Sequence, residues 1–248
     1  MPFELKTIGD WSYYHDPGLE KMGIAHGFMT RTSDAILRDA GRRAAFMAAL
    51  GAKEMIVLDQ EHGDAVHVIA AGERPLTGDG LVVVEPCVIG VIKTADCLPV
   101  ILCAPGQPAC AVVHAGWRGT AQLIVHKAVA AMAGLGVAAS SIRALIGPGI
   151  GLCCYNVGED VRTAFGAAGI DDGVFTERDG LSFLDLKEAN RRILIAEGVR
   201  HIDDAGLCTS CRRDLFFSAR RDARAGRQIT FALIKGQATA HAPDRETA

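Results

Sequence analysis

The pattern of apolar and polar positions divides the chain into many short strand-like runs and a few longer helix-like segments. Short apolar runs bounded by glycine and proline predict β-strands over residues 55–59, 65–70, 81–84, 88–93, 99–103, 110–114, 142–146 and 228–235. Segments that start at a capping residue predict helices over residues 33–50, 120–135, 157–168 and 185–197. The expected N-caps of three of these helices are Ser33, Thr120 and Asp185. Since strands and helices mix without strict alternation, we expect an α+β (mixed α/β) protein with a mixed sheet covered by helices.

Composition narrows the classes of protein. The 248 residues are 49% apolar and 22% charged, as in ordinary globular proteins. A net charge of −3 gives no general electrostatic reason to bind nucleic acid. No apolar run is long enough to span a membrane, so no membrane partner is expected. Residues 1–15 lack the apolar centre of a secretory signal, and a cytoplasmic location is therefore expected.

The eight cysteines are expected to be mostly buried thiols. Cys208 and Cys211 have the spacing of one zinc knuckle. Their partners in a zinc ribbon would have to be the adjacent pair Cys153 and Cys154, which lacks that spacing. We therefore expect buried thiols at these four positions as well.

A thiol and an imidazole stand at the ends of two strand-like runs. Cys97 follows the run 88–93, and His114 ends the run 110–114, 17 positions later. His62 lies in a turn 35 positions before Cys97. One thiolate and two imidazoles suit zinc or Cu(I) and leave a fourth position open, although these spacings match no short metal motif. A thiol nucleophile with an imidazole base is the other interpretation of the same pair.

Two other metal chemistries are not expected. A multicopper centre needs many histidines, usually as His-x-His pairs, and this chain has eight histidines and no such pair. The zinc deaminase signature, His-x-Glu with Pro-Cys-x-x-Cys, is also absent. Any deamination would therefore need a differently built site.

Several further residues are candidates for contacts with a substrate. Arg118 follows His114 closely, and Arg31 precedes the first predicted helix, so either one is a candidate for binding phosphate. The glycine-rich stretch 147–151 is either a tight turn or a set of backbone amides that face a ligand. Trp117 either stacks on a base or packs half-buried.

Four segments carry a family resemblance, in order, within residues 24–235. They are residues 94–99, 114–120, 146–155 and 215–221. Together they resemble the family known as laccase-domain or polyphenol oxidase proteins. The same family is described as purine nucleoside phosphorylases, and one branch as a peptidoglycan editing factor.

The resemblance implies a metal site and a fold. In that family a His, a Cys and a His hold one zinc ion, or in some cases copper, and the matching positions here are His62, Cys97 and His114. It also implies a single domain over residues 1–248, with mixed β-sheets sandwiched by helices. That arrangement is similar to the fold described for cysteine hydrolases, which include a toxin deamidase with a Cys-His pair.

The resemblance further implies phosphorolysis of adenosine, inosine and methylthioadenosine, with adenosine deamination as a second activity. A nucleoside and phosphate are then the expected partners. We expect Asp96 or Glu61 to handle protons and Arg31 or Arg118 to anchor phosphate. The expected substrate-binding residues are Gln60, Trp117, Gly147 and Gly149.

The chain departs from the family pattern at two places. The family often carries Gly-Gly-x-Ser after its Thr-Arg, whereas Thr32, Ser33 and Asp34 follow Arg31 here. Asn156 stands where the family usually has Glu. These departures spare the metal-ligand positions and fall among the expected substrate contacts.

Three alternatives stay open. The first is a metal-free amidohydrolase acting on a cell-wall precursor, with Cys97 as nucleophile and His114 as base. The second is a polyphenol oxidase with copper, and the third is a non-catalytic metal-dependent binding protein. The native metal and the oligomeric state do not follow from the sequence.

Overall fold

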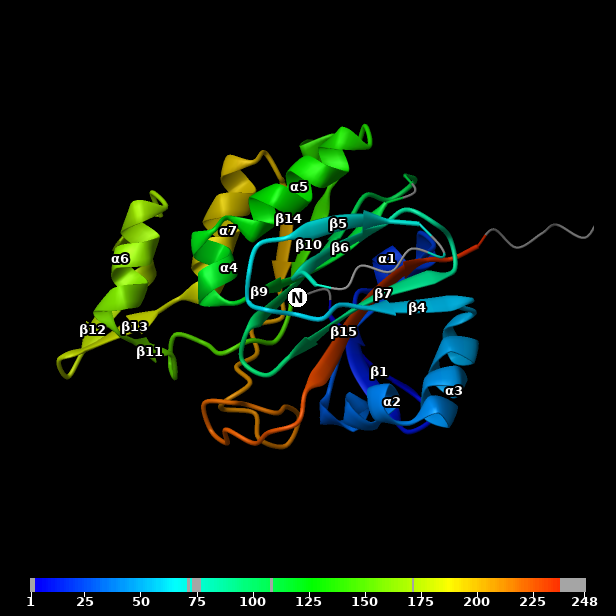
Figure 1. Ribbon diagram of the computed structural model, residues 1–248, viewed down its shortest axis with the longest axis horizontal. Helices are drawn as coiled ribbons and strands as arrows, with labels where there is room; N and C mark the ends of the chain where they lie inside the picture. Colours follow the sequence, from blue (N-terminus) through cyan, green and yellow to red (C-terminus); the bar gives the residue numbers. More distant parts are fainter. Residues whose placement is uncertain (1–2, 71, 73–76, 108, 171, 237–248) are drawn as a thin grey trace, which may run out of the picture.

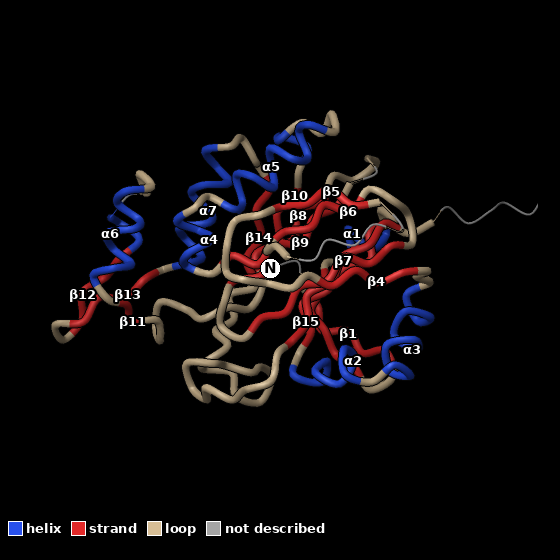
Figure 2. The backbone as a smooth tube through the Cα atoms, in the orientation of Figure 1, coloured by secondary structure: helices blue, strands red, loops and turns tan. Residues whose placement is uncertain are grey.

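The computed structural model describes residues 3–70, 72, 77–107, 109–170 and 172–236. Within these residues, two six-stranded mixed sheets carry the fold (Figures 1 and 2). The first sheet has the strand order β1 (Glu4–Ile8), β2 (Trp11–His15), β3 (Ile24–Met29), β15 (Gln228–Ile234), β7 (Val88–Thr94), β4 (Glu54–Val57). The second has the order β14 (His201–Asp204), β10 (Arg143–Ile146), β8 (Leu98–Cys103), β9 (Cys110–Ala115), β6 (Gly80–Val83), β5 (Val66–Ile69).

Helices cover the outer faces of the two sheets. The α-helices of the described residues are α1 (Pro17–Lys21), α2 (Asp34–Arg38), α3 (Ala40–Leu50), α4 (Trp117–Ala121), α5 (Ile124–Gly134), α6 (Glu159–Ala167) and α7 (Leu186–Ala196). Apolar side chains of α4, α5 and α7 pack on the second sheet, and those of α2 and α3 pack on the first. A small sheet of β11 (Asn156–Val157), β13 (Leu181–Leu184) and β12 (Phe175–Arg178) lies with α6 beyond one end of this sandwich (Figure 1).

The central core lies between the two sheets. Ile92 of β7, Ile101 of β8, Val112 of β9 and Leu145 of β10 belong to one buried apolar cluster there. Strands β8 and β9 are covered on both faces, which explains why their sequences are continuously apolar rather than alternating. Full burial of one such side chain stabilises the fold by about 1.5–3 kcal/mol.

The structure confirms the expected mixed α/β architecture and corrects two helices. The predicted helix over 33–50 is broken at Asp39, where the backbone is extended. The Asp39 carboxylate accepts the amide N–H of Arg42 and so caps the start of α3. The predicted helix over 120–135 is broken at Leu123, whose φ of 60° is left-handed. Consequently Thr120 lies inside α4 and is not an N-cap.

The other expected caps have different outcomes. Asp185 does cap α7, because its carboxylate accepts the amide N–H of Glu188 at 3.0 Å. Ser33 stands before α2 without a side-chain cap bond, and its hydroxyl donates instead to the carbonyl of Thr30. None of the described helices is long and apolar enough to cross a lipid bilayer.

Several strands were not expected from the pattern, although the last one, β15, was. They include β1–β3 near the N-terminus and β14, which pairs parallel with β10. Because the two strands are parallel, the segments that follow them leave the sheet at the same edge. The long segment between β14 and β15, residues 205–227, is mostly irregular (Figure 2) and is called the 205–227 loop below.

Candidate functional site

The β8–β9 hairpin brings a thiol and an imidazole together. In its antiparallel register Pro99 pairs with His114 and Leu98 with Ala115, so Cys97, one residue before β8, lies next to Gly116. A Cβ atom added to Gly116 would lie 3.1 Å from Sγ of Cys97 and 3.6 Å from the ring of His62. Glycine at this position therefore allows the close approach of both side chains.

Asp79 holds both histidines of the site. Its side chain is fully buried, and Oδ1 lies 2.7 Å from Nδ1 of His114. The same carboxylate accepts the backbone N–H groups of Glu61, His62 and Gly63. These bonds fix the turn in which His62 has a left-handed φ of 63°. Burial raises the pKa of Asp79, but the hydrogen bonds from His114 and Gly63 outweigh it and lower the pKa overall.

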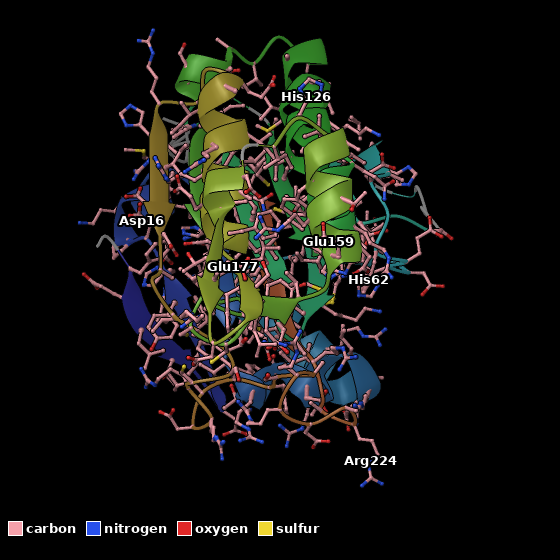
Figure 3. All side chains as sticks on the ribbon, turned by 90° about the vertical axis from the view of Figure 1, so that its left-hand side faces the viewer. Asp16, His62, His126, Glu159, Glu177 and Arg224 are labelled. Atoms are coloured by element: carbon pink, nitrogen blue, oxygen red, sulfur yellow. The ribbon has the colours of Figure 1, made fainter. Side chains whose placement is uncertain are left out.

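The side chains of His62, Cys97 and His114 converge on one point. Their ligand atoms all lie within 4.8 Å of one another, and the two imidazole ring centres are 4.9 Å apart. His114 is buried and Cys97 is partly buried, whereas His62 is exposed at the surface (Figure 3). The three residues expected to hold a metal therefore come together.

Electrostatics in this group favour a thiolate. Burial raises the pKa of Cys97, but hydrogen bonds with His114 and His62 outweigh it and lower that pKa to about 6. Burial lowers the pKa of His114, but Asp79 and Cys97 outweigh it and raise that pKa to about 9. A cysteine binds a metal as its thiolate. A histidine that binds a metal usually donates its other ring N–H to a carboxylate or a similar acceptor. The donor set of one thiolate and two imidazoles therefore fits zinc or Cu(I).

A cavity of about 510 Å³ opens beside this group. Besides His62, Cys97 and His114, the described residues that line it are Gln60, Lys93, Ala95, Asp96, Ile150, Tyr155, Ala219, Arg220 and Arg227. Three of them are cations, and Tyr155 supplies an aromatic ring over which the Arg220 guanidinium lies at 5.3 Å. The cavity thus combines a metal-binding donor set, positive charge and an aromatic wall.

Asp96 is placed at the site but is fully engaged. Its carboxylate accepts the hydroxyls of Thr209 at 2.6 Å and Ser218 at 3.0 Å, and the backbone N–H of Arg220 at 2.7 Å. Its backbone is left-handed, with φ of 91°. Asp96 directly precedes Cys97 in the chain, and its hydrogen bonds therefore hold the 205–227 loop beside the His62–Cys97–His114 group.

The two arginines expected to bind phosphate make other contacts. Arg31 donates to the carbonyl of Arg213 and lies over the ring of Phe217, and Arg118 lies over the ring of Trp117 at 4.4 Å. Neither is among the described residues that line the cavity. The cations that line it are Lys93, Arg220 and Arg227, of which the last two come from the 205–227 loop.

The remaining expected residues are spread around the site. Gln60 lines the cavity. Its side-chain Nε2 donates to the carbonyl of Lys93, and its Oε1 accepts the backbone N–H of Lys93, both at 2.8 Å. Glu61 is exposed beside His62. Trp117 is partly buried and packs against the apolar core under α4, as in the packing alternative.

The glycine-rich stretch is a tightly packed turn. A Cβ atom at Gly147 would lie 2.3 Å from the ring of Phe28, and one at Gly149 would lie 2.9 Å from Leu98. The amide of Gly147 donates to Pro99, and the amide of Ile150 donates to Asp96. Close packing therefore accounts for the two glycines.

Four cysteines form a second group, which contradicts the expectation of buried thiols. The Sγ atoms of Cys153, Cys154, Cys208 and Cys211 lie within 4.8 Å of one another. Cys153 and Cys211 are exposed, and all four thiols are free. The sequence spacing gave no indication of this group, because its two cysteine pairs are far apart in the chain. The parallel pairing of β10 with β14 brings the segments that carry them together. Both this group and the His62–Cys97–His114 group suggest metal binding.

Several site residues were missed from the sequence. Asp79 stands between two glycines before an apolar run, which turn chemistry also explains. Lys93 ends the predicted strand over 88–93, and Tyr155 follows the adjacent cysteines. Arg220 and Arg227 were not missed in the same way, because they belong to a run of arginines that is either a solvated edge or a phosphate-binding segment, although no single position in it stands out.

Comparison with known proteins gives concordant matches. The sequence model of a family described as multi-copper polyphenol oxidoreductase laccase matches residues 27–235. A purine nucleoside phosphorylase of Deinococcus radiodurans is 43% identical over 187 residues, which cover 74% of this chain and 72% of that protein. Adenosine deaminase RL5, from an unknown prokaryotic organism, is 39% identical over 166 residues, which cover 64% of this chain and 63% of that protein.

A solved structure matches the fold over almost the whole chain. The hypothetical protein YfiH of Bacillus licheniformis superposes with a TM-score of 0.84 at 30% sequence identity. The match covers 94% of this chain and 99% of that one. The span matched by the family, residues 27–235, includes the three metal-binding candidates and all the described residues that line the cavity.

Proposed function

We propose that this chain, which belongs to the family of multi-copper polyphenol oxidoreductase laccases, is a purine nucleoside phosphorylase that also deaminates adenosine. Relatives with these two names are 43% and 39% identical to it. The observation that carries the proposal is the cavity, where two imidazoles and a thiolate face the same space as three cations. The proposal treats residues 1–248 as one domain of this kind.

Phosphorolysis of a nucleoside breaks the N-glycosidic bond and forms a bond between C1′ and a phosphate oxygen, while the purine leaves and takes up a proton. Phosphate must therefore be held as an anion beside the ribose. Lys93, Arg220 and Arg227 line the cavity and are suited to this, since charge-assisted bonds to phosphate are strong. Tyr155 and Ile150 form the apolar wall against which a purine base would pack.

The two carboxylates expected to handle protons take different parts in this proposal. Both oxygens of Asp96 accept hydrogen bonds from the 205–227 loop, so we assign Asp96 a positioning part. Glu61 is exposed beside His62, and we assign it the transfer of protons at the rim of the site.

We propose that His62, Cys97 and His114 hold the metal, and that it is zinc. When bound, zinc supplies a Lewis acid at the reacting group. Among the described residues, the groups suited to a metal contain at most two histidines each, fewer than a multicopper centre needs. Thiolate ligands require reduced cysteines, so we place the protein in the cytoplasm.

One experiment tests the proposal directly. Zinc-loaded protein is incubated with adenosine, inosine or methylthioadenosine, with and without phosphate, and the products are separated by chromatography. We expect free base and a pentose 1-phosphate only when phosphate is present, and inosine from adenosine in both conditions. Absence of product from all three nucleosides in both conditions would refute the proposal.

A second candidate function rests on a separate observation. The lowered pKa of Cys97 beside the raised pKa of His114 is also the state of a thiol nucleophile with its base. Metal-free protein would then cleave amide-linked cell-wall precursors and react quickly with iodoacetamide at Cys97. Zinc bound to Cys97 would block this nucleophile, so activity with and without zinc separates the two functions: nucleoside turnover requires zinc, whereas cleavage of the precursor is lost when zinc is added.

A further inference from the structure

We propose that Cys153, Cys154, Cys208 and Cys211 together bind one structural zinc ion as a tetrathiolate. This site is separate from the His62–Cys97–His114 group. All four ligands come from the protein, which is the mark of a closed structural zinc site rather than a catalytic one.

The fold brings the two cysteine pairs to the same place. Strands β10 and β14 run parallel, and Ile146 pairs with Asp204 at their ends. The pairing continues past the strands, where Gly149 bridges to Cys208 and the amide of Thr209 donates to the carbonyl of Gly149 at 3.0 Å. The turn that carries the adjacent cysteines is thereby set against the Cys-x-x-Cys segment.

The sulfur positions match a single tetrahedral ion. Sγ of Cys211 lies 3.5 Å from Sγ of both Cys153 and Cys154. A zinc ion with four bonds of about 2.3 Å separates its sulfurs by about 3.8 Å. A disulfide needs about 2.05 Å between sulfurs. An iron–sulfur cluster distributes its thiolates over several iron atoms and spreads them further apart, so a mononuclear site fits best.

The surroundings of the sulfurs suit a negatively charged zinc tetrathiolate. The backbone N–H of Gly151 donates to Sγ of Cys208 at 3.2 Å. Arg178 donates to the carbonyl of Leu152, and Arg221 donates to the carbonyl of Ser210, so a guanidinium group binds the backbone directly beside each cysteine pair. N–H donors and nearby cations stabilise thiolates.

A zinc ion at the four cysteines would hold in place residues that form the wall of the cavity. Tyr155 directly follows the cysteine pair, and Thr209 lies between Cys208 and Cys211. Tyr155 lines the cavity, and the hydroxyl of Thr209 holds Asp96. Zinc in the tetrathiolate would therefore fix the 205–227 loop, with Arg220 on it, against the catalytic side of the molecule.

Metal content tests the site. Protein made in zinc-supplemented medium and purified without oxygen is analysed by elemental mass spectrometry. We expect two zinc ions per chain in the unmodified protein and in the control variant Cys87→Ser, whose thiol lies outside both groups. We expect one zinc ion in His62→Ala/Cys97→Ser, and one in Cys153→Ser/Cys211→Ser.

A second readout uses only the variant that keeps the four cysteines. His62→Ala/Cys97→Ser is reloaded with Co²⁺, and we expect the intense sulfur-to-cobalt absorption of four thiolates. The result therefore does not depend on whether Cys153→Ser/Cys211→Ser folds or on whether nucleosides are substrates. Absence of zinc and of this absorption, iron in place of zinc, or disulfides among the four cysteines would each overturn the proposal.

The structural part of the proposal has its own readout. Arg224 lies in the 205–227 loop, and its side chain points away from the body of the molecule (Figure 3), where trypsin can reach it. We expect Cys153→Ser/Cys211→Ser to be cut within the loop at least tenfold faster than Cys87→Ser. Equal cutting rates would show that no metal fixes the loop.

Discussion

Asp79 and His114 form a buried carboxylate–imidazole pair, with Oδ1 and Nδ1 separated by 2.7 Å. The pair leaves the other ring nitrogen of His114 available to a metal and fixes the direction in which the ring points. Because the same carboxylate binds the backbone of His62, one buried side chain positions two of the three candidate ligands.

The first prediction concerns Asp79. Asp79→Asn removes the charge that supports both histidines, and loss of such a partner lowers metal affinity by about 10- to 100-fold. Competition with a chromophoric zinc chelator measures this. Asp64→Asn, which removes a carboxylate paired with Lys127 at the surface, is the matched control and should leave the affinity unchanged. Equal affinities in the two variants would contradict the assigned part of Asp79.

The second prediction concerns Gly116. In Gly116→Ala the new methyl group would lie 3.1 Å from Sγ of Cys97, so the sulfur has to move, and zinc affinity should fall at least tenfold. Gly134→Ala, in α5 with nothing within 4 Å of the new methyl group, is the control. It should keep the affinity and gain up to about 1 kcal/mol in unfolding free energy. Retention of full zinc affinity in Gly116→Ala would show that the site tolerates the displacement.

The third prediction concerns phosphate. Lys93→Met removes one cation from the cavity and keeps the length of the side chain. Loss of one charge-assisted bond of about 1.5–3 kcal/mol raises the KM for phosphate by about 10- to 100-fold. Deamination of adenosine needs no phosphate and should change little. Lys53→Met, at an exposed position, is the control for both rates. A parallel loss of both activities would point to damage to the whole site.

The fourth prediction concerns stability against pH. His26 is 2% exposed, its Nε2 accepts the amide of Asp16 at 3.0 Å, and its Nδ1 donates to the carbonyl of Ile24 at 3.1 Å. Burial lowers its pKa to about 4, against 6.5 in the unfolded chain, although Asp16 and Glu20 oppose the shift. Between these values the unfolded chain binds the additional proton. The contribution of neutral His26 to the free energy of unfolding is therefore fully present above about pH 6.5 and is lost as pH falls toward 4.

Urea unfolding at pH 7.5 and pH 4.5 measures the effect. His26→Gln should lose about 2.5 kcal/mol less than the unmodified protein between the two pH values. His201→Gln, an exposed histidine on β14, should keep the full loss. If His26→Gln keeps the full loss too, the acid sensitivity comes from other groups.

The convergence of His62, Cys97 and His114 was predictable from their residue types together with the family resemblance, because one thiolate and two imidazoles suit a single metal ion. Cys97 and His114 end strand-like runs, and antiparallel neighbours bring such ends together. Asp79 was not predictable, since an aspartate between glycines also makes a turn. The four cysteines were misjudged because their meeting depends on the parallel β10–β14 pair, which unites segments more than 50 residues apart.

The errors in the helices have a similar origin. A single residue with left-handed backbone, Leu123, separates α4 from α5 inside one continuous apolar pattern. Nothing in the periodicity marks that break, because leucine favours helices. Packing of both short helices against the second sheet compensates for the unfavourable conformation.

Two residues of the site, His62 and Asp96, adopt backbone conformations that glycine would hold without strain, with φ of 63° and 91°. Such conformations cost on the order of 1–3 kcal/mol each in a residue that has a side chain. At Asp96 the three hydrogen bonds of the carboxylate offset this cost, whereas His62 is exposed. Selection of metal-free variants for melting temperature alone should therefore return glycine at position 62 rather than 96, and with it a more heat-stable protein that lacks one candidate metal ligand.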